Sequence, residues 1–260
     1  MKTASHYCKT NMAAALVALG TLLVSSAAIA LECGDTVTES VTLGEDIICT
    51  DPGDTGIIVG ASNVTIDLKG HSISGFKREG SVGILVQGVS NVTIQNGTVE
   101  FFARGVVVDV ASSITVGGII AKGHRQDGIY VEDSNLIDLT DNHLWYNVNG
   151  IVIRNGNNLR LVSNRAKKNS VVDFDVSQGV SVTLENNDSQ GNTGFAAYRT
   201  TGPAEVSFAG NRAIGFKGYG FQFADVAADS ITDGGGNRAN GKASQACFVN
   251  TSDPCPLILK

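Results

Sequence analysis

Short apolar segments in which β-branched residues alternate with other residues recur along most of the chain. Successive segments start 27, 22, 23, 22, 23, 21 and 26 residues apart. Alternation with a period of two predicts β-strands, and a nearly fixed spacing between similar strands predicts a repeat protein. The eight segments span residues 56–59, 83–86, 105–108, 128–131, 150–153, 173–176, 194–197 and 220–223.

Two further positions recur with each segment. A second apolar pattern trails the first, as in residues 62–66 and 90–94. A corner position then holds glycine or asparagine, which both tolerate left-handed backbone. Asparagines stacked from one turn to the next can also hydrogen-bond along the stack. The corner residues are Gly70, Gly97, Gly118, Asn142, Asn164, Asn187, Asn211 and Asn237.

A single turn of this repeat cannot bury its apolar side, so the turns must stack around one continuous core. We therefore predict an all-β parallel β-helix, a solenoid of about eight turns, over residues 56–245. Residues 31–55 and 246–260 are expected to cap its ends. The third residue after the leading glycine should point inward. The expected internal row is Val131, Ile153, Val176, Ala197 and Phe223.

The sequence resembles the right-handed parallel β-helix repeat family of the pectate-lyase-like superfamily. The repeat carries the resemblance, together with residues 33–36 (Cys-Gly-Asp-Thr) and residues 64–73. It implies a right-handed helix and allows several activities on polysaccharides. The catalytic signatures of polygalacturonases, pectate lyases and mannuronan epimerases are largely absent. The resemblance therefore implies a fold and leaves the reaction open.

Residues 1–30 have the pattern of a cleaved secretory leader. Lys2 and Lys9 precede a short apolar run, and residues 28–30 (Ala-Ile-Ala) form a cleavage site. We expect a secreted or periplasmic protein, and no later segment is apolar enough for a transmembrane helix. Removing the two leader lysines changes the formal charge from −6 to −8. This charge argues against nucleic-acid binding, which needs a basic surface.

Four cysteines follow the leader, as one pair near each end of the remaining chain. Four cysteines allow three pairings. We expect the disulfides Cys33–Cys49 and Cys247–Cys255, because each would close a terminal loop in an oxidising compartment. A zinc site is the alternative, although the spacings match none of the usual zinc patterns.

The outward positions of the repeat bring three charged residues together. Asp109, Glu132 and Arg154 occupy the fourth position after the leading residue in consecutive turns. Neighbouring strands lie about 4.8 Å apart, so Asp109 and Glu132 would be a candidate acid/base pair. Arg154 would hold a uronate carboxylate or neutralise Glu132. The alternative is an exposed ladder of mixed charge that contributes little.

A second candidate cluster precedes and begins the segment at Gly128. It contains His124, Arg125 and Asp127, with Tyr130 on the strand itself. Histidine, tyrosine and arginine are the residue types that proton abstraction from a uronate and stabilisation of the enolate would need. The alternative is a polar loop without chemistry. Asp175, Tyr198 and Arg125 are expected to contact the substrate.

Two functions remain open from the sequence. The first is association with a polysaccharide or a cell-envelope glycan along the outer strand face, with lyase, hydrolase or epimerase activity as an option. The second is a noncatalytic structural, adhesive or envelope-associated helix, which the short turns favour. No cofactor is firmly implied. Two acidic sets offer oxygen ligands for calcium, namely Asp225, Asp229 and Asp233, or Asp133, Asp138 and Asp141, and solvated turns are the alternative interpretation of both.

Overall fold

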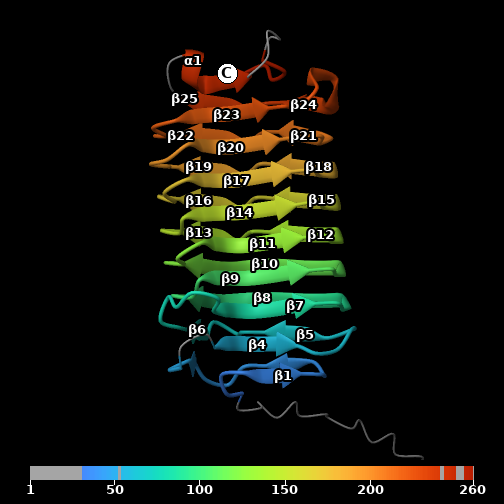
Figure 1. Ribbon diagram of the computed structural model, residues 1–260, viewed down its shortest axis with the longest axis vertical. Helices are drawn as coiled ribbons and strands as arrows, with labels where there is room; N and C mark the ends of the chain where they lie inside the picture. Colours follow the sequence, from blue (N-terminus) through green and yellow to red (C-terminus); the bar gives the residue numbers. More distant parts are fainter. Residues whose placement is uncertain (1–30, 52–53, 241–242, 250–254, 260) are drawn as a thin grey trace, which may run out of the picture.

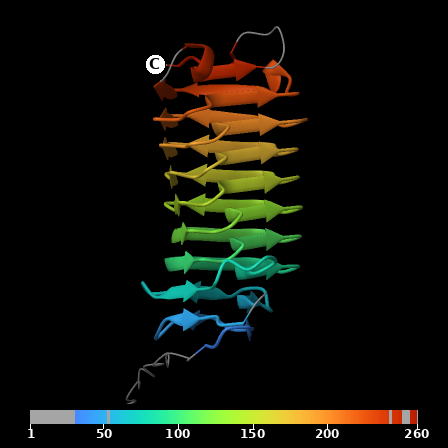
Figure 2. The same ribbon diagram turned by 60° about the vertical axis from the view of Figure 1, so that its left-hand side comes forward.

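The computed structural model describes residues 31–51, 54–240, 243–249 and 255–259. The predicted leader therefore lies outside the described residues. The described chain winds as a right-handed parallel β-helix of about nine turns, one more than predicted (Figure 1). The turns stack along the long axis like the steps of a ladder, as the rotated view in Figure 2 shows. The predicted fold class is confirmed.

One side of the helix is a parallel sheet that contributes one strand per turn. Its ten strands pair in chain order. They are β1 (Asp35–Val37), β4 (Thr55–Val59), β7 (Val82–Gln87), β9 (Arg104–Asp109), β11 (Asp127–Glu132), β14 (Asn149–Arg154), β17 (Val172–Ser177), β20 (Ala196–Thr201), β23 (Tyr219–Ala224) and β26 (Cys247–Val249). We call this the front sheet.

The other two sides form one continuous sheet of sixteen strands. These strands are β2 (Val41–Thr42), β3 (Ile47–Ile48), β5 (Thr65–Asp67), β6 (Ser72–Ser74), β8 (Ser90–Glu100), β10 (Ser112–Lys122), β12 (Asn135–Thr140), β13 (His143–Trp145), β15 (Asn157–Val162), β16 (Arg165–Lys167), β18 (Val180–Glu185), β19 (Asp188–Gln190), β21 (Val206–Ala209), β22 (Arg212–Ile214), β24 (Ile231–Gly235) and β25 (Arg238–Asn240). Helical structure is limited to η1 (Ala228–Ser230) and α1 (Ala243–Ala246) within the described residues. Neither is long enough to cross a membrane.

The corner between the two sides of the sixteen-stranded sheet contains two adjacent columns of residues, whereas the sequence predicted a single corner column. The first column has left-handed backbone and includes Gly118 and Asp141, with φ of 64° and 53°. The next column holds the buried asparagine stack, whose members have ordinary negative φ. The prediction that these asparagines share the left-handed conformation is therefore wrong, and Gly118 belongs to the first column. The stack consists of Asn142, Asn164, Asn187, Asn211 and Asn237.

The predicted hydrogen bonding along the asparagine stack is confirmed. Asn164 Nδ2 donates to the Oδ1 of Asn187 at 3.0 Å and to the carbonyl of Leu139 at 2.7 Å. Its own Oδ1 accepts the backbone N–H of Asn142 at 3.0 Å. Each amide therefore satisfies backbone groups of a neighbouring turn that would otherwise be buried without partners.

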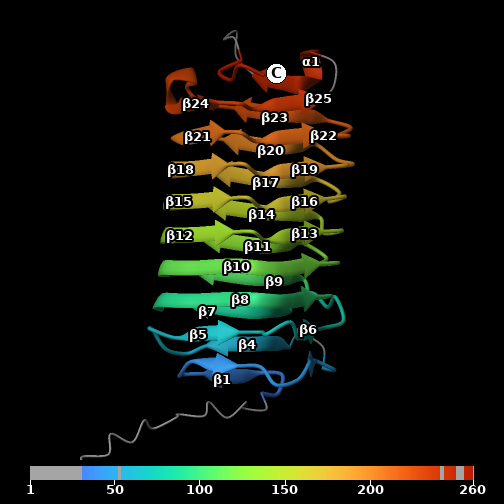
Figure 3. The ribbon, with the colours of Figure 1, turned by 180° about the vertical axis from the view of Figure 1, so that it is seen from behind.

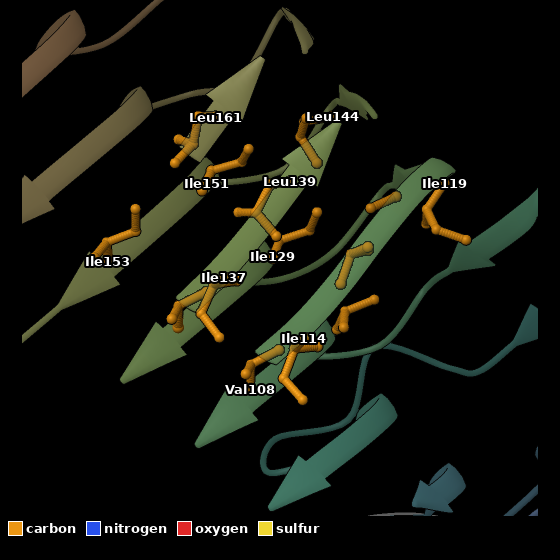
Figure 4. Close-up of a cluster of buried hydrophobic side chains, with 14 of the residues drawn as sticks. Val108, Ile114, Ile119, Ile129, Ile137, Leu139, Leu144, Ile151, Ile153 and Leu161 are labelled. Carbon is orange, nitrogen blue, oxygen red and sulfur yellow. The ribbon is translucent and has the colours of Figure 1, made fainter. Parts of the chain in front are cut away.

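Inside the helix, two rows of apolar residues from the front sheet face the other two sides (Figure 4). Ile129 and Ile151 lie in one row, and Val108 and Ile153 in the other. Near the C-terminus the first row becomes aromatic. The ring of Tyr198 stacks between those of Phe174 and Phe221, at 4.8 and 4.7 Å between centroids.

The disulfides Cys33–Cys49 and Cys247–Cys255 are both present, as predicted. They lie near the two ends of the stack. Strands β1 and β26, in the segments expected to be caps, also pair as the first and last strands of the front sheet. Each disulfide therefore ties down a turn whose outer strand edge has no further turn to pair with.

Candidate functional site

The outward residues of the front sheet form columns in which neighbours on consecutive turns lie side by side. The pairing register aligns Asp109 with Glu132, and Glu132 with Arg154. A second outward column contains Tyr130, Asp175, Arg199, Gln222 and Phe248. We call the outward side of strands β9 to β26 the front face.

The first cluster on the front face surrounds Tyr130. The guanidinium of Arg104 lies 4.1 Å from the centre of the Tyr130 ring, while Arg104 Nε donates to Asp127 Oδ2 at 3.0 Å. Partial burial, followed by the nearby carboxylate of Glu132 on the same strand, raises the pKa of Tyr130. Tyr130 therefore keeps its proton at neutral pH and can donate it, but it is a poor base.

Asp127 is buried, and both of its carboxylate oxygens are hydrogen-bonded to other side chains. Besides Arg104, it accepts a hydrogen bond from Asn149 Nδ2 at 2.8 Å on its other oxygen. Both carboxylate oxygens thus have partners on neighbouring turns. This arrangement fixes Arg104 above Tyr130 and leaves Asp127 better placed as a support than as a reacting group.

The second cluster joins Arg154, Asp175 and Arg199. Arg154 forms its ion pair with Asp175, at 2.8 Å, and among the described residues it has no such contact with Glu132. Arg199 binds both oxygens of the same carboxylate, with Nε to Oδ1 at 2.8 Å. Asp175 is only 2 % exposed. Two guanidiniums share one buried carboxylate, so this part of the face has an excess of positive charge.

An aromatic pocket of about 600 Å³ adjoins this second cluster. Tyr219 and Phe248 stack with centroids 4.5 Å apart, and Phe195 meets Tyr219 edge to face at 6.2 Å. The Arg199 guanidinium lies 5.9 Å from the Phe195 ring. The pocket is lined by Gly194, Phe195, Gly218, Tyr219, Gln245 and Phe248.

One polar atom beside this pocket is left without a partner. Gln222 lies between Arg199 and Phe248 in its column and is only 5 % exposed. Its Oε1 makes no hydrogen bond within the described chain. A buried acceptor without a donor is costly, and a ligand hydroxyl would satisfy it.

His124 lies in the interior of the helix and does not reach the front face. Its ring is 3 % exposed. Nδ1 accepts the backbone N–H of Phe102 at 3.2 Å, and Nε2 donates to the carbonyl of Val99 at 3.1 Å. Burial lowers the pKa of His124 to about 4. Both nitrogens are occupied, so His124 cannot serve as the surface base that its sequence context suggested.

The predicted outward position of Tyr198 is wrong. Its side chain is 1 % exposed in the core, and its hydroxyl donates to the Asn187 carbonyl at 2.7 Å. In this turn the register places Ala197, and not Gly194, opposite Asp173, three residues later than the glycine pattern indicated. This shift turns Tyr198 inward, replaces Ala197 with Thr200 in the internal row, and makes Arg199 the neighbour of Asp175.

Arg125 is exposed in the turn before β11, with its guanidinium 4.0 Å from the Glu79 carboxylate. It is therefore accessible to a ligand. The structure also adds residues that the sequence did not single out. Arg104 and Arg199 belong to the two clusters, and Phe195, Tyr219 and Phe248 form the pocket.

The described part of the chain contains no group of three or more His, Cys, Asp or Glu side chains arranged to hold a metal ion. Within the first acidic set considered for calcium, Asp233 already accepts hydrogen bonds from the backbone N–H groups of Gly235 and Ile258. That carboxylate holds the chain near its C-terminal end.

With this geometry, the family of the chain can be stated. Residues 82–234 match the family described as the right-handed beta helix region, so the protein belongs to that family. No curated protein sequence matches the chain.

Two solved structures share the fold. One is a mutant of the periplasmic alginate epimerase AlgG, with 12 % identity, a TM-score of 0.51, and coverage of 75 % of this chain and 50 % of the epimerase. The other is the alginate lyase from Paenibacillus sp. str. FPU-7, with 15 % identity, a TM-score of 0.50, and coverage of 80 % and 93 %. The chain thus spans half the length of the first relative and nearly all of the second.

Proposed function

We propose that this protein is an exported β-helix that binds a polysaccharide along its front face. The observation that carries the proposal is the aromatic pocket, which is continuous with the Arg154–Asp175–Arg199 cluster. Aromatic rings present a flat apolar surface to a sugar ring, while arginines and amides bind its hydroxyl or carboxylate groups. The two supports lie on one face, within reach of one extended ligand.

Export is supported by two features of the chain. Two disulfides favour an oxidising compartment, and the leader pattern of residues 1–30 would deliver the chain there. N-terminal sequencing of the protein recovered from outside the cytoplasm tests this. Cleavage after Ala30 is expected, and an intact Met1 on the exported material would contradict it.

Binding is tested with the chain from residue 31 to residue 260 against pectic, alginate and glycosaminoglycan polymers, with and without calcium. Alginate belongs in the panel because both fold relatives are named for it. Phe195→Ala removes an exposed ring from the pocket and should weaken binding about tenfold. Phe76→Ala removes another exposed ring far along the chain and serves as the matched control. Equal effects of the two variants would argue against the pocket.

Hydrolysis is a second candidate function, because Asp109 and Glu132 are register neighbours on the front face. The separation between such neighbours suits a pair of catalytic carboxylates. Elimination or epimerisation is less well supported, since His124 is buried and Tyr130 holds its proton. The remaining alternative is a structural or adhesive helix, to which the binding face would belong without catalysis.

New reducing ends and unsaturated uronate ends are measured on the same polymers, with Glu132→Gln beside the parent protein. Cleavage that disappears in Glu132→Gln would make the protein an enzyme with its centre at Asp109 and Glu132. Binding without cleavage would assign the front face to recognition alone.

A further inference from the structure

A second face of the helix carries an excess of positive charge. Strands β13, β16, β19, β22 and β25 stack above one another on the side seen at the right in Figure 3. With the residue that follows each of the first four, these strands contain five basic residues and one acidic residue, whereas the chain without its leader has a formal charge of −8. We call this side the basic face. Its basic residues are Arg165, Lys167, Lys168, Arg212 and Arg238.

The single acidic residue neutralises only part of this charge. Asp188 lies between Arg165 and Arg212 in the register. Arg212 binds it through two hydrogen bonds of 2.9 and 2.8 Å, and Arg165 approaches to 3.7 Å. Lys167, Lys168 and Arg238 have no acidic partner within 4 Å in the described part of the chain.

The arrangement is unfavourable for the fold alone. Arg212 and Arg238 are direct register neighbours, so two like charges lie side by side on a parallel sheet. Like charges in that position destabilise a sheet. Arrangements that lower the stability of the fold are typical of binding sites. An anionic ligand would neutralise the repulsion between these two arginines.

An aromatic side chain lies in the neighbouring outward column, which contains Lys167. Trp145 is the register neighbour of Lys122 on one side and Lys167 on the other, and it stacks on His143 at 5.1 Å. Its indole Nε1 is buried and makes no hydrogen bond within the described residues. The ring of Trp145 therefore lies between Lys122, which forms an ion pair with Glu100 at 2.9 Å, and Lys167, which has no acidic partner among the described residues.

The length of the row indicates the kind of ligand. Four strand steps separate Trp145 on β13 from Arg238 on β25, or about 19 Å at the usual strand spacing. A single ion would contact only a small part of this row. A linear polymer with anionic groups at intervals would contact all of it, and its sugar rings could stack on Trp145.

We infer that the basic face binds an acidic polysaccharide through Arg165, Lys167, Lys168, Arg212 and Arg238, with Trp145 as its aromatic contact. The inference is independent of the proposed function of the front face. The shared chemistry is a row of carboxylate or sulfate groups on a sugar chain.

Intrinsic fluorescence tests this directly, because Trp145 is the only tryptophan in the chain. Polygalacturonate and heparin serve as carboxylated and sulfated probes, and neutral dextran as the control. Both acidic probes should change the emission, with an effect that weakens as salt is raised. Tighter binding of heparin would point to sulfate, and tighter binding of polygalacturonate to carboxylate.

A charge-matched pair of variants locates the surface. The triple variant Lys167→Gln, Lys168→Gln and Arg238→Gln should bind the acidic probe at least about tenfold more weakly. The control triple variant Lys69→Gln, Arg78→Gln and Arg160→Gln removes the same charge from other exposed positions and should change binding less than about twofold. Thermal unfolding of both confirms that they are folded.

Three results would overturn the inference. The first is equal weakening in both triple variants, because binding would then follow net charge alone. The second is the absence of any probe-dependent change in tryptophan emission or binding. The third is tight binding of duplex DNA with none of either glycan. Loss of front-face binding in Phe195→Ala, with basic-face binding intact, would show that the two surfaces act separately.

Discussion

His124 and Asn147 occupy equivalent positions in consecutive turns, and Asn147 Oδ1 accepts the backbone N–H of His124 at 2.9 Å. Asn169 repeats the arrangement one turn further, accepting the N–H of Asn147 at 2.9 Å. His124 makes the same two bonds with its ring, to Phe102 and Val99. His124 is thus the first member of a second buried ladder, and its ring makes the hydrogen bonds that an asparagine side chain makes in the following turns.

This position predicts an acid sensitivity that one substitution should remove. Burial lowers the pKa of His124 to about 4 in the folded protein, against 6.5 for an ordinary histidine. Between these values the unfolded chain binds the extra proton, so the stability that neutral His124 provides is present above pH 6.5 and lost as pH falls toward 4. The loss should be about 3 kcal/mol. His124→Asn should fold, because asparagine fits this ladder, and denaturant unfolding between pH 7.5 and 4.5 should show a smaller decline than in the parent. A parallel decline in both proteins would contradict this account.

Asp173 should have the opposite dependence on pH. It is buried where the other turns place a small residue, such as Gly150, and burial raises its pKa to about 6. Between 3.8 and 6 the folded protein binds the extra proton, so this group's contribution to stability falls as pH rises through that range.

Asp173→Asn should therefore unfold at higher denaturant than the parent at pH 7.5, by up to about 3 kcal/mol. The amide can still accept from Asn169 and donate to Ser189, the present partners of the carboxylate. The exposed acid Asp133, changed to Asn, is the control and should have little effect. A less stable Asp173→Asn variant at pH 7.5 would show that the charge of Asp173 stabilises the core.

The main asparagine ladder should be intolerant of substitution. Asn164→Ala removes bonds to Asn187 and Leu139 and leaves the Asn142 N–H without an acceptor. Unsatisfied buried groups cost about 1–3 kcal/mol each, so we expect a loss of about 3 kcal/mol or more in chemical denaturation. Asn135→Ala, at an exposed position in the preceding turn, should lose less than about 1 kcal/mol. Similar losses in the two variants would mean that the ladder adds nothing specific.

Reducing the two disulfides should lower the unfolding midpoint and promote association. Cys33–Cys49 and Cys247–Cys255 close segments with sequence separations of 16 and 8. Loops of this size contribute about 2–3 kcal/mol each through the unfolded state, and frayed end turns would expose strand edges. Thermal unfolding and light scattering with and without reductant measure both effects. A reduced sample that stays monomeric with an unchanged unfolding midpoint would contradict the prediction that the disulfides stabilise the end turns.

The sequence predicted the strands well because their pattern is local. Alternation of β-branched residues around each leading glycine is enough to assign strands such as β11 and β14, and their stacking then follows from the repeat. It failed at Tyr198, because the strand of that turn is aligned on Ala197, three residues after the glycine that leads the pattern. The regular spacing of Asp173, Ala197 and Gly220, 24 and 23 residues apart, contained the correct alignment.

The candidate site was harder to predict because a charged side chain can pair with any of several neighbouring side chains, and the sequence does not show which pair forms. Glu132 is the register neighbour of Arg154, whereas Asp175 is only a diagonal neighbour in the other outward column, and the side-chain geometry nevertheless selects Asp175. His124 looked like a surface group because Asn147, 23 residues further along, and Asn169, another 22 residues on, were not recognised as a ladder with it. The aromatic pocket joins residues from three turns, at Phe195, Tyr219 and Phe248, and no local motif marks it.

Because the register of the front sheet is regular, outward-facing groups are held at fixed intervals along the helix axis. Groups in one column are separated by whole numbers of strand steps, each about 4.8 Å. Inserting or deleting one complete turn would move the Tyr130 cluster relative to the aromatic pocket by one step, without altering either cluster internally. Duplication of a turn can therefore change the distance between the two clusters, while the side-chain contacts within each cluster are conserved.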